Sequence, residues 1–153
     1  MTDACEIANR PPKPDYTPAD DEITGLLETA KFIAVVGLSD KPHRDSFIVG
    51  EYLADHGYRV IPVNPALAQR SWLGITAYPD IASIPGEVDI INVFRRAEAI
   101  MELVPAMIAK KPKSVWLQLG IVNNEASSIL RSAGIMVVQN KCIKIEHSLL
   151  IGG

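Results

Sequence analysis

The segment after the first apolar run of the chain carries residues suited to binding a phosphate group. The run ends at Gly37, and Ser39, Lys41, Arg44 and Ser46 follow it. Glycine lets a ligand approach the backbone closely, and an arginine can hold a phosphate through two parallel hydrogen bonds. A helix that begins near Ser46 would add its free N–H groups and the positive end of its dipole. The sequence therefore predicts an anion site here. In the alternative interpretation, Ser46 only caps the helix and Arg44 is a solvated surface residue.

The spacing of this segment differs from two well-known loop motifs. A dinucleotide-binding loop has glycines at G-x-G-x-x-G and an acid after the second strand. Here Ser39 and Pro42 take the second and third glycine positions, and the second apolar run ends at Asn64 without an acid. This pattern favours a ligand with a phosphorylated ribose over NAD. A nucleophile elbow needs glycine where Lys41 stands, which disfavours a hydrolase.

The cysteines and histidines offer little further chemistry. The histidines are scattered and do not match the spacing of a zinc site, and two cysteines are too few for a disulfide framework. Cys5 lies in an expected tail. Cys142 has Lys141 and Lys144 nearby, which could stabilise a thiolate and make it redox-active. The alternative is that Cys142 packs like a small apolar side chain.

Alternating apolar runs and helical segments must position these residues. Continuous apolar runs are typical of parallel strands buried on both faces, and the alternation predicts right-handed crossovers. We expect an α/β, Rossmann-like three-layer fold whose five-stranded parallel sheet has the order 3-2-1-4-5. The expected strands cover residues 32–37, 58–63, 88–94, 114–119 and 135–138.

Helical periodicity predicts an extra N-terminal helix, with Thr17 as its N-cap and Pro18 at its first position. Pro105 should kink a later helix or force an irregular turn. We expect an extended tail over residues 1–16 and a single domain over residues 17–153. The three helices between strands are expected at residues 46–56, 97–110 and 123–133.

Charge and hydrophobic pattern limit the kinds of ligand that the protein can bind and the cellular compartment in which we expect it. The 153-residue chain has a formal net charge of −3 and a pI of about 5.6, which argues against sequence-independent nucleic-acid binding. The chain has no apolar run of membrane-spanning length and no export signal. We therefore expect a cytoplasmic protein with no membrane partner. A homodimer, or association with a partner enzyme subunit, stays open.

In a sheet of this kind, ligands bind beyond the carboxyl ends of the strands, where the strand order reverses. Five segments at the expected strand ends form a combined pattern: Val36-Gly37-Leu38-Ser39, Ile61-Pro62-Val63-Asn64-Pro65, Val93-Phe94-Arg95-Arg96, Val115-Trp116-Leu117-Gln118-Leu119-Gly120 and Asn140-Lys141-Cys142-Ile143-Lys144-Ile145-Glu146-His147. Over residues 23–147 this pattern resembles the stand-alone CoA-binding domain family, which is similar to the CoA-binding domain of the succinyl-CoA synthetase alpha subunit.

The resemblance implies a coenzyme A site made of three groups of residues. The residues implied around the diphosphate are Gly37, Leu38, Ser39 and Arg44, with Lys41 and Ser46 as further candidates in the same loop. The residues implied around the adenosine are Asn64, Pro65, Phe94 and Arg95, with Arg96 as a further candidate. The residues implied along the path of the pantetheine arm are Gln118 and Gly120.

One position departs from the family pattern. Related sequences often have a basic residue directly after the Asn-Pro pair, suited to a ribose phosphate, whereas this chain has Ala66. Arg70, Arg95 or Arg96 would have to bind that phosphate instead. For Cys142, the functional hypothesis is a mixed disulfide with the coenzyme A thiol, or another redox role.

The expected function is non-catalytic binding of coenzyme A or an acyl-CoA. The sequence contains no evident set of nucleophile, base and metal ligands, and the catalytic histidine of the synthetase belongs to segments that this chain lacks. Two alternatives stay open. One is an NAD(P)-binding domain of an oxidoreductase completed by a partner, and the other is a regulatory protein with a vestigial nucleotide cleft.

Overall fold

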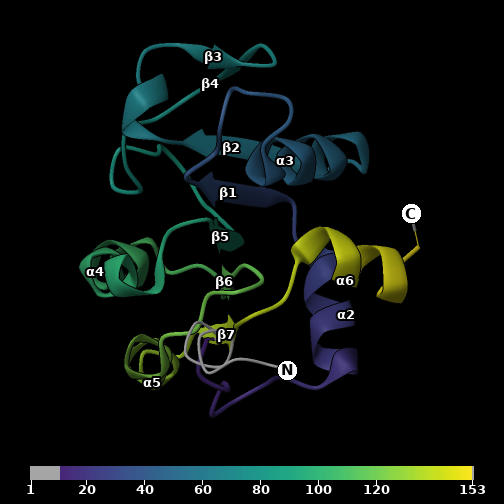
Figure 1. Cartoon of the computed structure of the whole chain (residues 1–153), viewed down its shortest axis with the longest axis vertical. Coiled ribbons are helices and arrows are strands. Elements are labelled where there is room, and N and C mark those ends of the chain that lie inside the picture. The colour runs from purple at the N-terminus through teal and green to yellow at the C-terminus, as the bar shows by residue number, and fades with distance from the viewer. Residues whose placement is uncertain (1–10, 153) are drawn as a thin grey trace, which may run out of the picture.

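A central parallel sheet with helices on both faces forms the body of the protein (Figure 1). The computed structural model describes residues 11–152. The sheet strands are β1 (Phe32–Val36), β2 (Arg59–Val63), β5 (Ile90–Val93), β6 (Ser114–Leu117) and β7 (Met136–Val138). A short hairpin of β3 (Ser71–Trp72) and β4 (Ile75–Thr76) lies beyond β2.

Within residues 11–152, five helices and two short 3-10 turns surround the sheet. The helices are α2 (Asp20–Thr29), α3 (Asp45–Asp55), α4 (Ile100–Lys110), α5 (Asn124–Ser132) and α6 (Ile143–Leu150), and the turns are η1 (Pro65–Leu67) and η2 (Ala97–Ala99). Within residues 11–152, no helix has both the length and the apolar character needed to cross a membrane.

The strand order confirms the predicted Rossmann-like fold. The five long strands lie in the order β2-β1-β5-β6-β7, all parallel to their neighbours. In the 3-2-1-4-5 pattern, a strand numbered 3 lies at the edge of the sheet, next to strand 2. At this edge, on the outer side of β2, the structure has a single parallel bridge between Tyr78 and Val63. The apolar run at residues 88–94 therefore lies beside β1, in the other half of the sheet. The order reverses between β1 and β5.

Alternate residues along each strand build two separate cores. Ile33 and Val35 of β1 pack with α2, α3 and α6, whereas Ala34 and Val36 pack with α4 and α5. Figure 1 shows α4 and α5 together on one face of the sheet, and the other three helices on the opposite face. Burial on both faces explains why the strand sequences read as unbroken apolar runs.

The N-terminal helix was predicted, but its start was wrong. Helix α2 begins at Asp20 with Ala19 in the N-cap position, two residues after Thr17. The Glu22 carboxylate accepts a hydrogen bond from the Ala19 backbone N–H at 3.0 Å. The acidic side chains of the first turn also interact favourably with the helix dipole, so this start is stabilised without a hydroxyl cap.

The segment before α2 packs against α5. The Asp15 backbone N–H donates to the Asn124 side-chain oxygen at 3.1 Å, and the Arg131 guanidinium lies 3.7 Å from the Asp15 carboxylate. The same guanidinium covers the Tyr16 ring at 4.5 Å from its centroid. The predicted tail at residues 1–16 is thus held to the domain over its described part; residues 1–10, including Cys5, lie outside the described residues.

Two helical details differ from the sequence interpretation. Helix α4 runs unbroken through Pro105, and the irregularity falls earlier, where η2 precedes α4. No helix was expected after the last strand, yet α6 follows β7 after the short segment of residues 139–142. Its N-cap residue, Cys142, makes no side-chain capping bond. Without such a signal, the helix depends on packing of Ile143 and His147, which are buried.

Candidate functional site

An open groove of about 770 Å³ lies at the carboxyl ends of β5 and β6. Helix α3 supplies one wall and the start of α6 supplies the other. The residues that line the groove are Asp45, Ile48, Val49, Phe94, Arg95, Arg96, Ala97, Glu98, Gln118, Leu119, Gly120, Ile121, Cys142, Lys144 and Ile145. The lining is largely apolar with a few charged groups at its edge, as in many small-molecule sites.

The groove brings together one part of the sequence-predicted site. The predicted residues that line it are Phe94, Arg95, Arg96, Gln118, Gly120 and Cys142. The remaining predicted residues lie outside the groove, in the loops after β1 and β2 and at the first turn of α3; they are Gly37, Leu38, Ser39, Lys41, Arg44, Ser46, Asn64 and Pro65. The two parts adjoin at the start of α3, because Asp45 lines the groove and follows Arg44 directly.

Gln118 is the buried polar side chain at the base of the groove. It is only 6% exposed, and its side-chain oxygen accepts hydrogen bonds from the Asn92 amide at 3.2 Å and from the Ile143 backbone N–H at 3.3 Å. A backbone N–H can only donate, so the atom facing Ile143 must be Oε1. The Nε2 group of Gln118 has no partner among the described residues and is left to donate to a ligand in the groove.

Asn92 extends this polar pair beneath the groove. It lies on β5 between Val35 and Trp116 of the neighbouring strands and is fully buried. Its amide nitrogen donates to Gln118 and, at 3.4 Å, to the Trp116 carbonyl. Its side-chain oxygen is the one buried polar side-chain atom within residues 11–152 that lacks a protein partner. Sequence reasoning missed Asn92 because it stands inside an otherwise apolar strand.

The start of α3 presents free backbone donors toward the loop after β1. Arg44 is the N-cap residue and makes no side-chain capping bond. The backbone N–H groups of Asp45, Ser46 and Phe47 have no acceptor among the described residues. Such a helix start attracts anions through its N–H groups and its dipole. No side chain of the described residues accepts a hydrogen bond from these N–H groups, and the exposed Lys41 and Arg44 add positive charge nearby.

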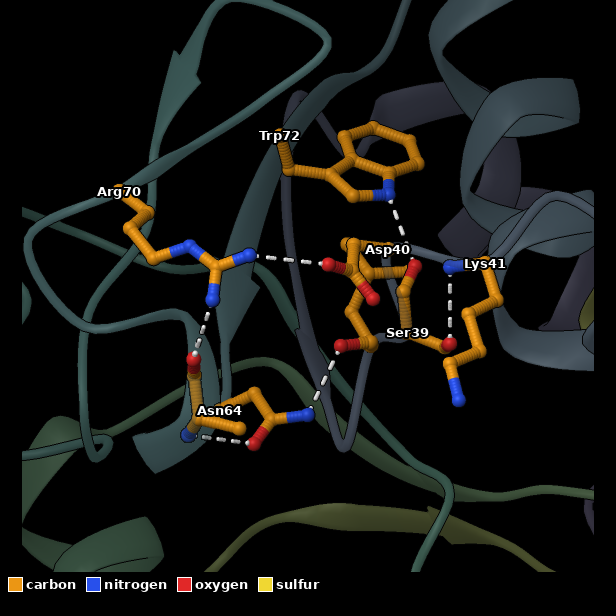
Figure 2. A network of polar contacts seen from close by, with 8 residues as sticks. Ser39, Asp40, Lys41, Asn64, Arg70 and Trp72 are labelled. Carbon is orange, nitrogen blue, oxygen red and sulfur yellow. Dashed lines mark hydrogen bonds and ion pairs between the residues drawn. The ribbon is translucent and has the colours of Figure 1, made fainter.

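The loop after β1 is held by three hydrogen bonds centred on Ser39, and Figure 2 shows two of them, with Lys41 and Trp72. The Ser39 backbone N–H donates to the Ser46 hydroxyl oxygen at 3.0 Å, and the Lys41 backbone N–H donates to the Ser39 hydroxyl oxygen at 3.0 Å. The Trp72 indole N–H donates to the Ser39 carbonyl, also at 3.0 Å. Both serine oxygens act as acceptors inside the loop, so their hydroxyl protons stay available for an anion.

Gly37 is required where β1 meets this loop. Its backbone has φ +88°, a region that side chains disfavour, and a Cβ at this position would lie 2.6 Å from the Phe94 carbonyl oxygen. The close approach brings the loop after β1 against the loop after β5. Leu38, the next residue, is fully buried in the core, so only its backbone is available to the ligand that the resemblance implies.

Asn64 joins the loops after β1 and β2. Its amide nitrogen donates to the Leu38 carbonyl at 2.9 Å, and its side-chain oxygen accepts the Ala66 backbone N–H at 3.0 Å. Asn64 therefore has a structural role in fixing the turn. Pro65 is exposed at the first position of η1. Neither residue supplies a charge for a ribose phosphate.

Cys142 occupies a place compatible with both interpretations from the sequence. It is half-buried, packs against the core beneath α6 and lines the groove. The nearby Lys144 also lines the groove, while the Lys141 ammonium lies 4.0 Å from the Glu146 carboxylate.

The sequence of this domain matches a known family. Residues 31–148 match the CoA binding domain. The chain belongs to the CoA binding domain family. A relative in Bacillus subtilis (strain 168), the uncharacterized protein YneT, is 39% identical over 132 residues, which cover 86% of this chain and 96% of the relative.

Solved structures show the same fold. The cell-free ID.343 protein from Thermus thermophilus has a TM-score of 0.84 and 39% identity, covering 87% of this chain and 99% of that chain. A hypothetical protein from Pyrococcus horikoshii OT3 has the same TM-score and identity, covering 93% and 99%. The dinucleotide forming acetyl-coenzyme A synthetase 1 of Ca. Korarchaeum cryptofilum, in complex with phosphate and ADP, has a TM-score of 0.62. At 23% identity, covering 72% of this chain and 26% of that protein, this match shows the fold alone.

Sequence reasoning missed the side chains that shape the groove walls. Ile48 projects from α3, and Ile145 from α6, a helix that the sequence analysis did not predict. Both are apolar yet exposed, at 39% and 49%. An exposed apolar residue on an otherwise polar helix face is a weak signal of a binding surface, and only the fold brings these two helices together.

Proposed function

We propose that this domain binds coenzyme A or an acyl-CoA without catalysing a reaction. The diphosphate lies at the start of α3, the adenosine lies against the loops after β1 and β2, and the pantetheine arm enters the groove. Membership in the CoA binding domain family supports coenzyme A as the ligand. The observation that carries the placement is the set of free N–H groups at Asp45–Phe47, which adjoins the groove directly.

The groove has the chemistry that a pantetheine arm needs. This arm alternates apolar segments with amide groups, and the groove offers apolar walls at Ile48, Leu119 and Ile145. The free Nε2 group of Gln118 supplies a donor for a carbonyl oxygen. An acyl group on the coenzyme sulfur would continue along the same apolar surface, because burial of each methylene contributes about 0.8 kcal/mol.

The polar groups at the groove support binding rather than catalysis. Glu98 is exposed and its carboxylate lies 3.6 Å from the Arg96 guanidinium. Asp45 lies in the first turn of α3, where its negative charge interacts favourably with the positive end of the helix dipole. Neither carboxylate is paired with a second acid or base of the kind that general acid–base chemistry uses.

Calorimetry with coenzyme A and with 3′-phosphoadenosine 5′-diphosphate tests this placement, because the second ligand lacks the pantetheine arm. Arg44→Gln should weaken both ligands about tenfold or more, the loss expected for a charged hydrogen bond of ~1.5–3 kcal/mol. Ile145→Asp should weaken coenzyme A and leave the shorter ligand unchanged. Leu149→Asp is the matched control, since Leu149 is 74% exposed on the same helix and does not line the groove.

Two results would overturn the proposal. One is the absence of any binding heat with coenzyme A for the folded wild-type chain. The other is tighter binding of NADPH than of coenzyme A in direct competition, which would favour the oxidoreductase alternative. If Ile145→Asp binds coenzyme A as tightly as the Leu149→Asp control, the pantetheine arm does not use the groove.

A further inference from the structure

Arg70 places a positive charge beside the end of β2, where Ala66 itself has no charged side chain. Its Nη1 group donates to the Ala66 carbonyl oxygen at 3.4 Å, so the side chain folds back over the turn formed by η1. Figure 2 shows the guanidinium extended across this turn, close to Asn64. The side chain is 61% exposed, which leaves most of its donors open to a ligand.

The other contact of Arg70 is an acidic side chain from the neighbouring loop. Its Nη2 group lies 3.1 Å from the Asp40 carboxylate, in the loop after β1. Both side chains are well exposed, and exposed ion pairs of this kind contribute little to folding. A ligand anion can therefore replace Asp40 at small cost to the fold.

Geometry separates Arg70 from the other two arginines named in the sequence analysis. Arg95 and Arg96 line the groove beyond β5, on the opposite side of β1 from β2. Arg96 also faces Glu98. Among these three arginines, only Arg70 contacts the turn that follows β2.

In folds of this kind, residues at the end of the second strand distinguish a ribose with free hydroxyls from a phosphorylated ribose. An acid there binds free hydroxyls, and a nearby arginine accommodates a phosphate on the ribose. In this chain Asn64 is neutral, and both ends of its amide are already used within the protein. The planar guanidinium of Arg70 has the geometry to grip a phosphate through paired hydrogen bonds.

We propose that Arg70 binds the phosphate on the ribose of the coenzyme and that Asp40 holds the guanidinium in place until this phosphate arrives. The inference rests on the proposed function, since it names the specificity residue of the same site. On binding, the phosphate replaces the Asp40 carboxylate as the anionic partner of Arg70. The site thereby selects coenzyme A over the same ligand without its 3′-phosphate.

Calorimetry with coenzyme A and dephospho-coenzyme A tests this inference. The wild-type chain should bind coenzyme A at least about tenfold more tightly. Arg70→Gln should remove this preference by weakening coenzyme A alone, and Arg70→Lys should restore part of it. Asp40→Asn should strengthen coenzyme A binding up to about fivefold at low salt, because the competing carboxylate is gone. Arg59→Gln is the control, since Arg59 is exposed at the opposite end of β2.

The outcomes separate this inference from the proposed function. Equal affinity of the wild-type chain for both ligands, or an Arg70→Gln variant that loses both alike, overturns the role of Arg70 while coenzyme A binding stands. A wild-type chain that binds neither ligand overturns the proposed function, and this inference with it. Circular dichroism and a thermal melt of each variant confirm that it folds before the titrations are compared.

Discussion

The side-chain oxygen of Gln118, just past β6, accepts the backbone N–H of Ile143, the first residue of α6. This bond fixes the start of the helix against the base of the groove. The same oxygen accepts the Asn92 amide, so a single side chain links β5, β6 and α6. The position of one groove wall therefore depends on a residue that also lines the groove.

Gln118→Leu should lower both stability and ligand affinity. The change leaves two buried donors unpaired, at Asn92 and Ile143, and each costs about 1–3 kcal/mol. Urea denaturation and calorimetry with coenzyme A measure the two effects. Gln139→Leu is the matched control, because Gln139 is equally buried and hydrogen-bonded at the end of β7 but does not line the groove. If both variants retain wild-type affinity, Gln118 has no part in ligand binding.

Gly37→Ala should destabilise the protein more than Gly120→Ala. Both glycines have nearly the same backbone, with φ +88° and +89°, so each variant loses about 1–2 kcal/mol from conformational strain. A Cβ at residue 120 meets open space, whereas a Cβ at residue 37 clashes with the Phe94 carbonyl. This overpacking adds about 1–3 kcal/mol. Equal free energies of unfolding for the two variants would show that the loops after β1 and β5 separate easily.

Asp89 should make stability depend on acidic pH. Burial raises the pKa of its carboxyl, but hydrogen bonds from the backbone N–H groups of Phe32 and Lys31, together with the charge of Lys113, outweigh burial and lower it overall. The unfolded chain has an aspartate pKa of about 3.9. The stabilisation is therefore present above that value, and it is lost as the pH falls through the lower folded-state pKa.

Asp89→Asn should cost about 1.5–3 kcal/mol at neutral pH, the contribution of hydrogen bonds to a charged group. The gap between this variant and the wild type should narrow as the pH drops below about 4. Urea denaturation at several pH values measures this gap. Glu87→Gln serves as the comparison, because Glu87 is exposed two residues away. A gap that stays constant with pH contradicts the assignment.

Cys142 should form a mixed disulfide when the protein is treated with coenzyme A disulfide. The thiolate attacks one sulfur, the ligand's own disulfide bond breaks, and one coenzyme A leaves as its thiolate. Mass spectrometry with peptide mapping measures the adduct on Cys142, and Cys142→Ser removes it. No adduct on Cys142 in a protein that binds coenzyme A would leave packing beneath α6 as the role of this residue.

The sheet could be predicted from the sequence because strands that are buried on both faces need continuous apolar residues. Strands β1 and β5 are covered on both faces and therefore read as apolar runs. The start of α2 was misplaced because Glu22 caps the Ala19 backbone from within the helix, a contact that competes with the more familiar hydroxyl cap. The eight-residue α6 has no capping side chain, so only its packing against other helices reveals it.

The candidate site was predictable only where it follows strand ends. Gly37 and Gln118 stand directly after apolar runs, and parallel strands gather such positions at one edge of the sheet. The contact between Arg70 and Asp40 joins residues 30 positions apart. No periodicity encodes such a contact, because it depends on how the two loops fold over each other.

The bonds around Ser39 also set a limit on how this protein can change during evolution. Its anchors come from three separate places: Ser46 in α3, Trp72 in the hairpin and Lys41 in the loop itself. The bond between Ser39 and Ser46 spans seven positions, so it is kept only if the number of residues between them stays the same. Exposed positions within this stretch are free to vary in identity, whereas an insertion or deletion there would separate the loop from the start of α3.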